Sequence, residues 1–196
     1  MFASLFEKYD RLVLFDTETT GLTYSRDEII EFAAVVVEAA DGEAKITREY
    51  DELVALSPGG FVPPKIEQLT GISTQDLRER GLSKTRICRD IAELIAGNTL
   101  LLAYNAHFDL SFLFYLLLRS GDPAILKGKD KLDLLTVYKD RHKEALEQIL
   151  EHHKGQRHKH YACIYNAVFE YLTLRSQRRR NGTDKGYSDY RKDNAK

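Results

Sequence analysis

The sequence places two carboxylates, Asp16 and Glu18, at the end of an apolar run that covers residues 12–15. Four apolar residues in a row predict a buried strand, and the turn residues Thr20 and Gly21 predict its end. Because side chains alternate along a strand, Asp16 and Glu18 should project from the same face. Neighbouring carboxylates favour a cation between them, and oxygen ligands without His or Cys suit Mg²⁺ or Mn²⁺ rather than zinc. An acidic strand end exposed to water is the alternative interpretation of this pair.

Length and composition describe an ordinary globular chain. It has 196 residues, of which 43% are hydrophobic and 30% are charged, and its formal net charge is −1. This length favours one domain with a substantial core, and any nucleic-acid contact must come from a local basic patch. No apolar run is long enough for a signal peptide or a membrane span, so we expect a cytoplasmic protein without membrane contact. Cys88 and Cys163 are isolated in the sequence and are expected to be reduced structural thiols.

The elements that must position the two carboxylates follow from periodicity and turn signals. Further strands are predicted at residues 28–37, 45–54, 99–104 and 131–135, the last of which enters a helix. Helices are predicted at residues 66–69, 74–80, 87–95, 110–117, 144–153 and 161–174. Strands first, and then strands interleaved with helices, predict an α/β domain with a mixed central sheet and helices on both faces. We expect this domain to span residues 1–174, and the basic residues 175–196 to form a disordered tail.

Two further segments extend the pattern begun by residues 15–22, which read FDTETTGL. Residues 69–72 read LTGI, and residues 104–109, directly after a predicted buried strand, read YNAHFD. In this order and spacing, the three segments resemble the DEDD superfamily of 3′-to-5′ exonucleases, to which the proofreading subunit of DNA polymerase belongs. The resemblance covers residues 10–174 and implies a ribonuclease H-like fold. Three ordered matches are far more specific than the Asp-x-Glu pair alone.

The resemblance implies a site that binds two Mg²⁺ or Mn²⁺ ions. In this family the first Asp and Glu hold the metals together with two later aspartates, so Asp16, Glu18 and Asp109 are expected ligands. Two metal ions supply a hydroxide near neutral pH and stabilise the charge of the transition state. The residues at positions that grip the terminal nucleotide in the family are Thr19, Leu22, Asn105 and Phe108. Core packing is the alternative role for Phe108, and turn formation is the alternative for Asn105.

In this family a last catalytic motif, called here the third motif, follows near the C-terminal end of the domain. It usually consists of a His, four further residues, and then an Asp followed by Ala, and this chain departs from that pattern. Alignment on residues 166–167 places Tyr161 at the position of the His and Asn166 at the position of the fourth metal ligand. His160 is an alternative general base, and Glu170, on the same helical face as Asn166, is an alternative source of the missing carboxylate. A solvated basic loop and a solvated helix face explain His160 and Glu170 more simply.

An Asn carbonyl can ligate a hard ion but contributes no charge, so Asn166 should weaken metal binding. Asn166 is compatible with a divergent enzyme that retains activity. It is equally compatible with a degenerate domain that binds without cutting, and with a substitution introduced to disable the enzyme.

The predicted function is metal-dependent 3′-to-5′ hydrolysis at single-stranded DNA or RNA ends, with release of nucleoside monophosphates. Basic residues between positions 127 and 159 would draw a nucleic-acid backbone to that side, although a solvated surface is an alternative explanation. The resemblance also implies a DNA polymerase as a partner. Two other functions stay open: a catalytically degenerate module that binds nucleic acid or a polymerase, and a ribonuclease H-like endonuclease.

Overall fold

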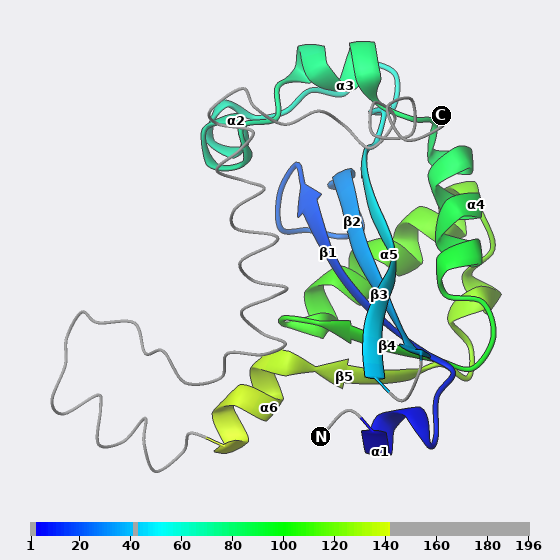
Figure 1. Cartoon of the computed structure of the whole chain (residues 1–196). Helices are drawn as coiled ribbons and strands as arrows, with labels where there is room; N and C mark the ends of the chain where they lie inside the picture. The colour runs from blue at the N-terminus through cyan, green and yellow to red at the C-terminus, as the bar shows by residue number, and fades with distance from the viewer. Residues whose placement is uncertain (1–2, 41–42, 142–196) are drawn as a thin grey trace, which may run out of the picture.

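The computed structural model describes residues 3–40 and 43–141, and its centre is a five-stranded sheet (Figure 1). The strands are β1 (Arg11–Thr19), β2 (Ile29–Ala40), β3 (Glu43–Leu53), β4 (Thr99–Ala103) and β5 (Asp130–Asp133). Their order across the sheet is β3-β2-β1-β4-β5. β2 runs antiparallel to β1 and β3, whereas β4 runs parallel to β1 and β5. The mixed sheet predicted from the sequence is therefore confirmed.

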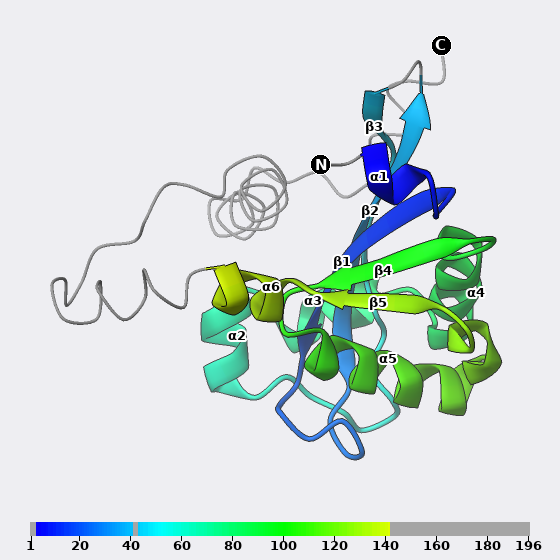
Figure 2. The same ribbon diagram turned by 90° about the horizontal axis from the view of Figure 1, so that it is seen from below.

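Helices cover both faces of this sheet, as predicted. They are α1 (Ala3–Phe6), α2 (Pro64–Thr70), α3 (Thr74–Arg80), α4 (Lys84–Leu94), α5 (Ala106–Ser120) and α6 (Leu134–Arg141). A 3₁₀ turn, η1 (Pro123–Leu126), precedes β5. Figure 2 shows α4 and α5 on one side of β1, β4 and β5, and α1 on the other side.

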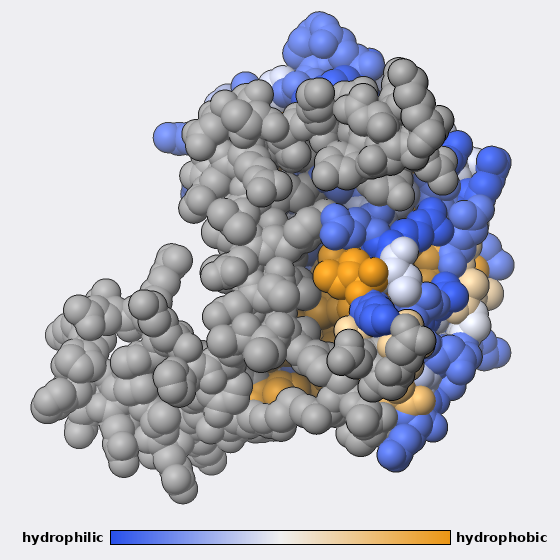
Figure 3. All heavy atoms as spheres, viewed as in Figure 1, coloured by the Kyte–Doolittle hydropathy of each residue, from blue (hydrophilic) through white to orange (hydrophobic). Residues whose placement is uncertain are grey.

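Alternate residues of β1 enter two different cores. Val13 and Phe15 lie in the larger core, which α4 and α5 cover. Leu12 and Leu14 lie in a smaller core on the opposite face, against α1. Figure 3 shows that opposite face, where apolar residues gather near the middle and hydrophilic residues border them on the right. Because the alternation continues along the strand, it also sets the faces of residues 16–18.

α5 begins earlier than its apolar pattern predicts. The periodicity starts at residue 110, but the helix begins at Ala106, because Asn105 turns the chain directly after β4 in a left-handed conformation (φ 60°, ψ 51°). Asp109 therefore lies in the first turn of the helix and not in a loop. This difference matters for the site, since it fixes the Asp109 carboxylate on a rigid element.

The other predicted elements in the described range lie where the sequence indicates, with ends that differ by a few residues. The predicted helices at residues 144–153 and 161–174, the expected tail at residues 175–196 and Cys163 lie outside the described residues. Cys88 is a buried free thiol in α4, as expected. Within residues 3–40 and 43–141, no helix has both the length and the apolar character that a membrane span requires.

Candidate active site

Asp16 and Glu18 lie half-buried near the C-terminal end of β1, and α2 and α3 lie beyond this end of the sheet (Figure 1). The buried Thr17 separates them, so the burial pattern agrees with both carboxylates on one face. The register partner of Glu18 on β2 is Glu31, which is itself buried. Directly paired residues of an antiparallel ladder share a face, so a third carboxylate lies beside Glu18. The sequence analysis missed Glu31, although a charged residue inside an otherwise apolar strand was a usable signal.

Asp109 joins this strand end through Thr17. In the described structure β4 pairs with β1 only at residues 11–14, so the last part of β1 extends beyond that ladder. There the backbone N–H of Thr17 donates to Oδ1 of Asp109 at 3.0 Å, and the Thr17 hydroxyl donates to the same oxygen at 2.8 Å. The Asp109 carboxylate thus takes the place that a strand carbonyl would occupy, and only 2% of the residue is exposed.

Burial and a neighbouring charge change the protonation of Asp109. Burial, and next the negative charge of Asp16, raise the pKa of the Asp109 carboxyl from 3.8 to about 7, while the hydrogen bonds from Thr17 oppose this shift. Two carboxylates that repel each other in a buried place are stabilised by a cation, so the donor set fits a divalent metal ion with oxygen ligands. Within the described residues, no three His, Cys, Asp or Glu side chains are placed so that they could hold a metal ion together.

The turn after β1 presents an apolar side chain to solvent. The Thr19 hydroxyl donates to the Gly21 carbonyl at 2.6 Å and tightens this turn. A Cβ atom at Gly21 would lie 2.4 Å from Oδ2 of Asp27, so the close approach of that carboxylate requires glycine. Leu22 follows and is 82% exposed. An exposed leucine at the end of β1 is suited to packing against a base or sugar.

Asn105 is held by a residue that the sequence analysis did not single out. The backbone N–H of Asn105 donates to Oδ1 of Asp133 at 3.1 Å. The same oxygen of Asp133 accepts from the backbone N–H of Leu135 at 2.9 Å, at the start of α6. Asp133 therefore ties the turn between β4 and α5 to the end of β5. An aspartate directly before a helical pattern is a capping signal that could have drawn attention to it.

Phe108 is half-buried and packs against the larger core. Its ring centroid lies 4.8 Å from that of Phe112, within the same helix. The core-packing role considered for Phe108 is therefore present, and its contact with a nucleotide stays a prediction. Asn105 likewise has the turn-forming role that was its alternative, because its φ of 60° is the one positive value among the described residues other than glycine.

Four of the singled-out residues lie outside the described part of the chain, namely His160, Tyr161, Asn166 and Glu170. The general base and the fourth metal ligand therefore stay predictions. The basic stretch that begins at residue 127 is described in part. Lys127 and Lys131 are exposed, whereas Lys129 donates a hydrogen bond to the Gly97 carbonyl.

A family comparison decides the assignment. The family model RNase_T, described as Exonuclease, matches residues 13–163, which include β1 from Val13 onward, the Asn105 turn and Asp109. The chain belongs to this exonuclease family. It is thereby a member of the DEDD superfamily, as the segments at residues 15–22, 69–72 and 104–109 indicated.

Two curated relatives are proteins in which this exonuclease-family region is one part. The chain is 37% identical over 112 residues to the 3′-5′ exonuclease DinG of Bacillus subtilis, covering 57% of this chain and 11% of that protein. It is 34% identical over 102 residues to DNA polymerase III subunit epsilon of Treponema pallidum, covering 50% of this chain and 42% of that protein. The chain thus spans less than half the length of each of these two relatives.

The fold is also found in a solved structure. E. coli Exonuclease I in complex with a dA16 oligonucleotide matches with a TM-score of 0.60 and 24% sequence identity, covering 71% of this chain and 30% of that chain. At this level of identity the match concerns the fold. It confirms the ribonuclease H-like sheet with helices on both faces for this member of the exonuclease family.

Proposed function

We propose that this chain is a metal-dependent 3′-to-5′ exonuclease that hydrolyses phosphodiester bonds at single-stranded DNA or RNA ends and releases nucleoside monophosphates. The observation that carries the proposal is the buried carboxylate of Asp109, bonded to Thr17 on the strand that also bears Asp16 and Glu18. The family membership and the similarity to a 3′-5′ exonuclease support the reaction and its direction. A site for one terminal nucleotide favours a single strand, because a paired end would have to fray before it could enter.

Three carboxylates would hold two Mg²⁺ or Mn²⁺ ions, namely those of Asp16, Glu18 and Asp109. When bound, the ions supply a hydroxide near neutral pH and neutralise the charge of the transition state. The chain itself contributes negative charge on a rigid strand and a fixed orientation of Asp109, which Thr17 secures. Asn166 in place of the fourth Asp lowers the charge of the ligand set, so metal binding is weaker than in a site with four carboxylates. His160 or Tyr161 serves as the general base.

The terminal nucleotide lies between the turn after β1 and the start of α5. Thr19 ends β1 and its hydroxyl bonds to the turn, and Leu22 is exposed in the turn itself. Asn105 and Phe108 lie on the other side, where Asp133 fixes the backbone of Asn105. Leu22 and Phe108 offer apolar surface to the base or sugar, and the backbone near Thr19 and Asn105 offers hydrogen bonds.

A catalytically degenerate module of the same fold is the second candidate function, and Asn166 is the observation that favours it. Such a module binds nucleic acid or a polymerase and does not cut. The similarity to a polymerase III epsilon subunit supports a polymerase as the protein partner of either form. A polymerase partner would bind the full chain whether or not the candidate active site cleaves nucleic acid.

A 3′-labelled oligonucleotide incubated with Mn²⁺ separates these functions. The full chain is expected to release labelled mononucleotide, and Asp16→Ala is expected to abolish the release. Asn166→Asp should increase the rate and tighten Mn²⁺ binding, because it restores the missing charge. Release at the level of Asp16→Ala would refute the enzyme and favour the binding module, whereas cuts in a circular single strand would show an endonuclease.

A further inference from the structure

A groove of about 700 Å³ runs along the outer side of α5, and we call it the α5 groove. The residues that matter for its chemistry are Tyr24, His107, Phe114, Tyr115, Lys127 and Lys131. Its helical wall includes His107 and Phe114, which lie seven residues and therefore about 10 Å apart along the helix axis. The opposite wall comes from the region of η1 and β5, and Figure 2 shows β5 beside α5.

The α5 groove and the candidate active site share the first turn of α5. His107 lines the groove from the first turn of α5, two residues before Asp109. His107 is exposed, whereas Asp109 is buried against Thr17, so the helix separates the groove from the carboxylates by its own width. A strand whose terminal nucleotide lies between Leu22 and Phe108 can therefore continue past His107 into the groove.

Aromatic rings line the α5 groove and are partly open to solvent. Tyr24 is 39% exposed and Phe114 is 43% exposed. The centroid of the Tyr115 ring lies 5.2 Å from that of Tyr24 and 5.8 Å from that of Phe114, so the three rings form one cluster. Open aromatic faces are the platforms on which unpaired bases stack, whatever their identity. Paired bases have no free face for such contacts, which favours a single strand.

The charged residues that line the α5 groove are cationic. Lys127 and Lys131 are exposed, and no Asp or Glu is among the described residues that line the groove. In the described part of the chain neither lysine forms an ion pair. Both cations are therefore available to phosphate groups without the cost of breaking an internal pair.

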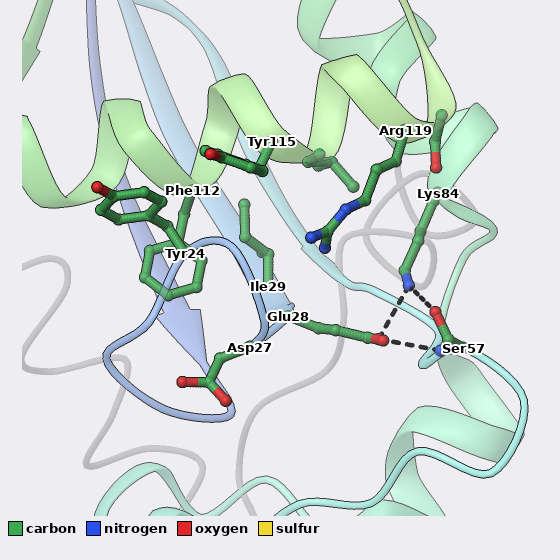
Figure 4. Close-up of a pocket in the computed structure, with 11 residues that line it drawn as sticks. Tyr24, Asp27, Glu28, Ile29, Ser57, Lys84, Phe112, Tyr115 and Arg119 are labelled. Atoms are coloured by element: carbon green, nitrogen blue, oxygen red, sulfur yellow. Dashed lines mark hydrogen bonds and ion pairs between the residues drawn. The ribbon is translucent and has the colours of Figure 1, made fainter.

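A second pocket, next to Glu28 and Lys84, is less suitable for binding a polyanion than the α5 groove. It has a volume of about 240 Å³, shares Tyr24 and Tyr115 with the α5 groove, and contains Lys84 and Glu28 (Figure 4). Lys84 donates to Glu28 at 2.9 Å and to the Ser57 hydroxyl at 2.6 Å, so its charge is already neutralised. The carboxylate of Glu28 would repel a phosphate. Charge complementarity with a polyanion therefore belongs to the α5 groove and not to this pocket.

We propose that the α5 groove binds the nucleotides that precede the 3′-terminal nucleotide of a single-stranded substrate. Their bases stack on Phe114 and on the Tyr24 and Tyr115 rings, and their phosphates pair with Lys127 and Lys131. This inference rests on the proposed function for the position of the 3′ end. The groove volume lies within the range of about 300–1,000 Å³ that is typical of ligand sites.

Binding of fluorescein-labelled dT12 and rU12 to the full chain tests the α5 groove, measured by anisotropy in EDTA over a range of salt concentrations. Phe114→Ala should weaken binding about fivefold or more, because a lost stacking contact has that effect. Lys127→Gln and Lys131→Gln should each reduce the slope of log K against log salt by about 0.7. Leu118→Ala, on the same helix, and Arg89→Gln, on α4, are matched controls outside the groove and should bind as the unaltered protein does.

The binding assay requires no metal ion and no cleavage, so it separates this inference from the proposed function. If the unaltered chain cleaves oligonucleotides but the three groove variants bind both of them like the controls, the groove inference is wrong and the exonuclease stands. If the chain never cleaves but the groove variants lose binding, the groove inference holds and the proposed exonuclease function is wrong. A loss with dT12 alone or with rU12 alone supports the groove and identifies the sugar it accepts.

Discussion

Thr17 holds Asp109 by two hydrogen bonds to one carboxylate oxygen, the backbone N–H at 3.0 Å and the hydroxyl at 2.8 Å, across 92 residues of sequence. The bonds join β1 to the first turn of α5 at the point where β1 extends past its ladder with β4. They also lower the pKa of Asp109 against the larger effects of burial and of Asp16. Thr17 is therefore a positioning residue, because it acts through Asp109.

Asp109→Asn should stabilise the metal-free protein at pH 8 and leave it nearly unchanged at pH 3, below the unfolded pKa of Asp. The pKa of Asp109 is raised to about 7 in the folded chain, above the usual value of an unfolded Asp, so the folded state retains a proton that the unfolded state releases. The stability that the protonated group contributes is fully present below pH 3.8, falls as the pH rises, and is lost once the pH has passed about 7. The side-chain amide of the Asp109→Asn variant is uncharged at every pH, like the protonated carboxyl, so the variant does not lose this stability. Thermal unfolding in EDTA measures the difference, and cleavage should be lost in the same variant.

Asp10→Asn is the matched control, since Asp10 is an exposed carboxylate next to β1. It should not reproduce the gain at pH 8. An equal gain in both variants would mean that a general reduction of negative charge, and not the burial of Asp109, governs the pH dependence.

Thr17→Val should raise the pKa of Asp109 further and lower the rate of cleavage. The backbone hydrogen bond remains, but the hydroxyl that helps to stabilise the carboxylate is removed. We expect a loss of about 1 kcal/mol in the free energy of unfolding. Thr17→Ser retains the hydroxyl and should have the pKa of Asp109 and the rate of cleavage that the unaltered protein has. A carbon-13 titration of the Asp109 carboxyl measures the pKa, and an unchanged pKa in the valine variant would contradict the positioning role.

Asp133→Ala should raise KM for oligonucleotides more than it lowers kcat. Its carboxylate accepts hydrogen bonds from the backbones of Asn105 and Leu135, so its removal loosens the turn beside the predicted nucleotide contacts and the start of α6. The stability loss should be about 1 kcal/mol, as for other capping residues. Ser83→Ala removes the cap of α4, where the Ser83 hydroxyl accepts from the backbone of Arg86, and serves as the control. Similar changes in KM for both variants would show a global effect.

Glu28 and Lys84 should stabilise each other, with a coupling of about 1 kcal/mol in a double-mutant cycle of Glu28→Gln and Lys84→Met. Burial alone would raise the pKa of Glu28, but hydrogen bonds from Lys84 and Ser57 outweigh it and lower the pKa. The stabilisation is therefore present above the unfolded pKa of Glu28 and is lost as the pH falls through its lowered folded value. Urea unfolding at pH 7 and pH 3 checks this dependence. A coupling that is as large at pH 3 as at pH 7 would argue against an ionic interaction.

The fold was predictable because most of its elements carry strong periodic patterns. The alternating cores of β1, the apolar β2 and the helical spacing in α4 are properties of local sequence. The start of α5 was not predictable in the same way. Asn is a common N-cap residue, but the apolar spacing that marks this helix begins only at residue 110, whereas the helix begins at Ala106. In the described structure Asn105 enters the helix in a left-handed conformation and makes no side-chain cap bond.

The candidate site was predictable where its residues lie close together in sequence or in a motif, as Asp16, Glu18 and Asp109 do. Asp133 was missed because its partner, the backbone of Asn105, is 28 residues away and is brought close only by the parallel pairing of β4 and β5. Glu31 was missed because its relation to Glu18 depends on the β1–β2 register. The catalytic roles assigned by resemblance stay predictions, including those of the residues in the third motif.

The amide of Thr17 gives this fold a spectroscopic reporter of its own. Its N–H is held by a side-chain carboxylate, whereas Leu12 and Val13 lie in the part of β1 that pairs with β4. The NMR resonance of the Thr17 amide should therefore follow the charge of Asp109, moving when the carboxyl ionises and again when a cation is added. One backbone signal can thus record protonation and metal occupancy without substrate or turnover.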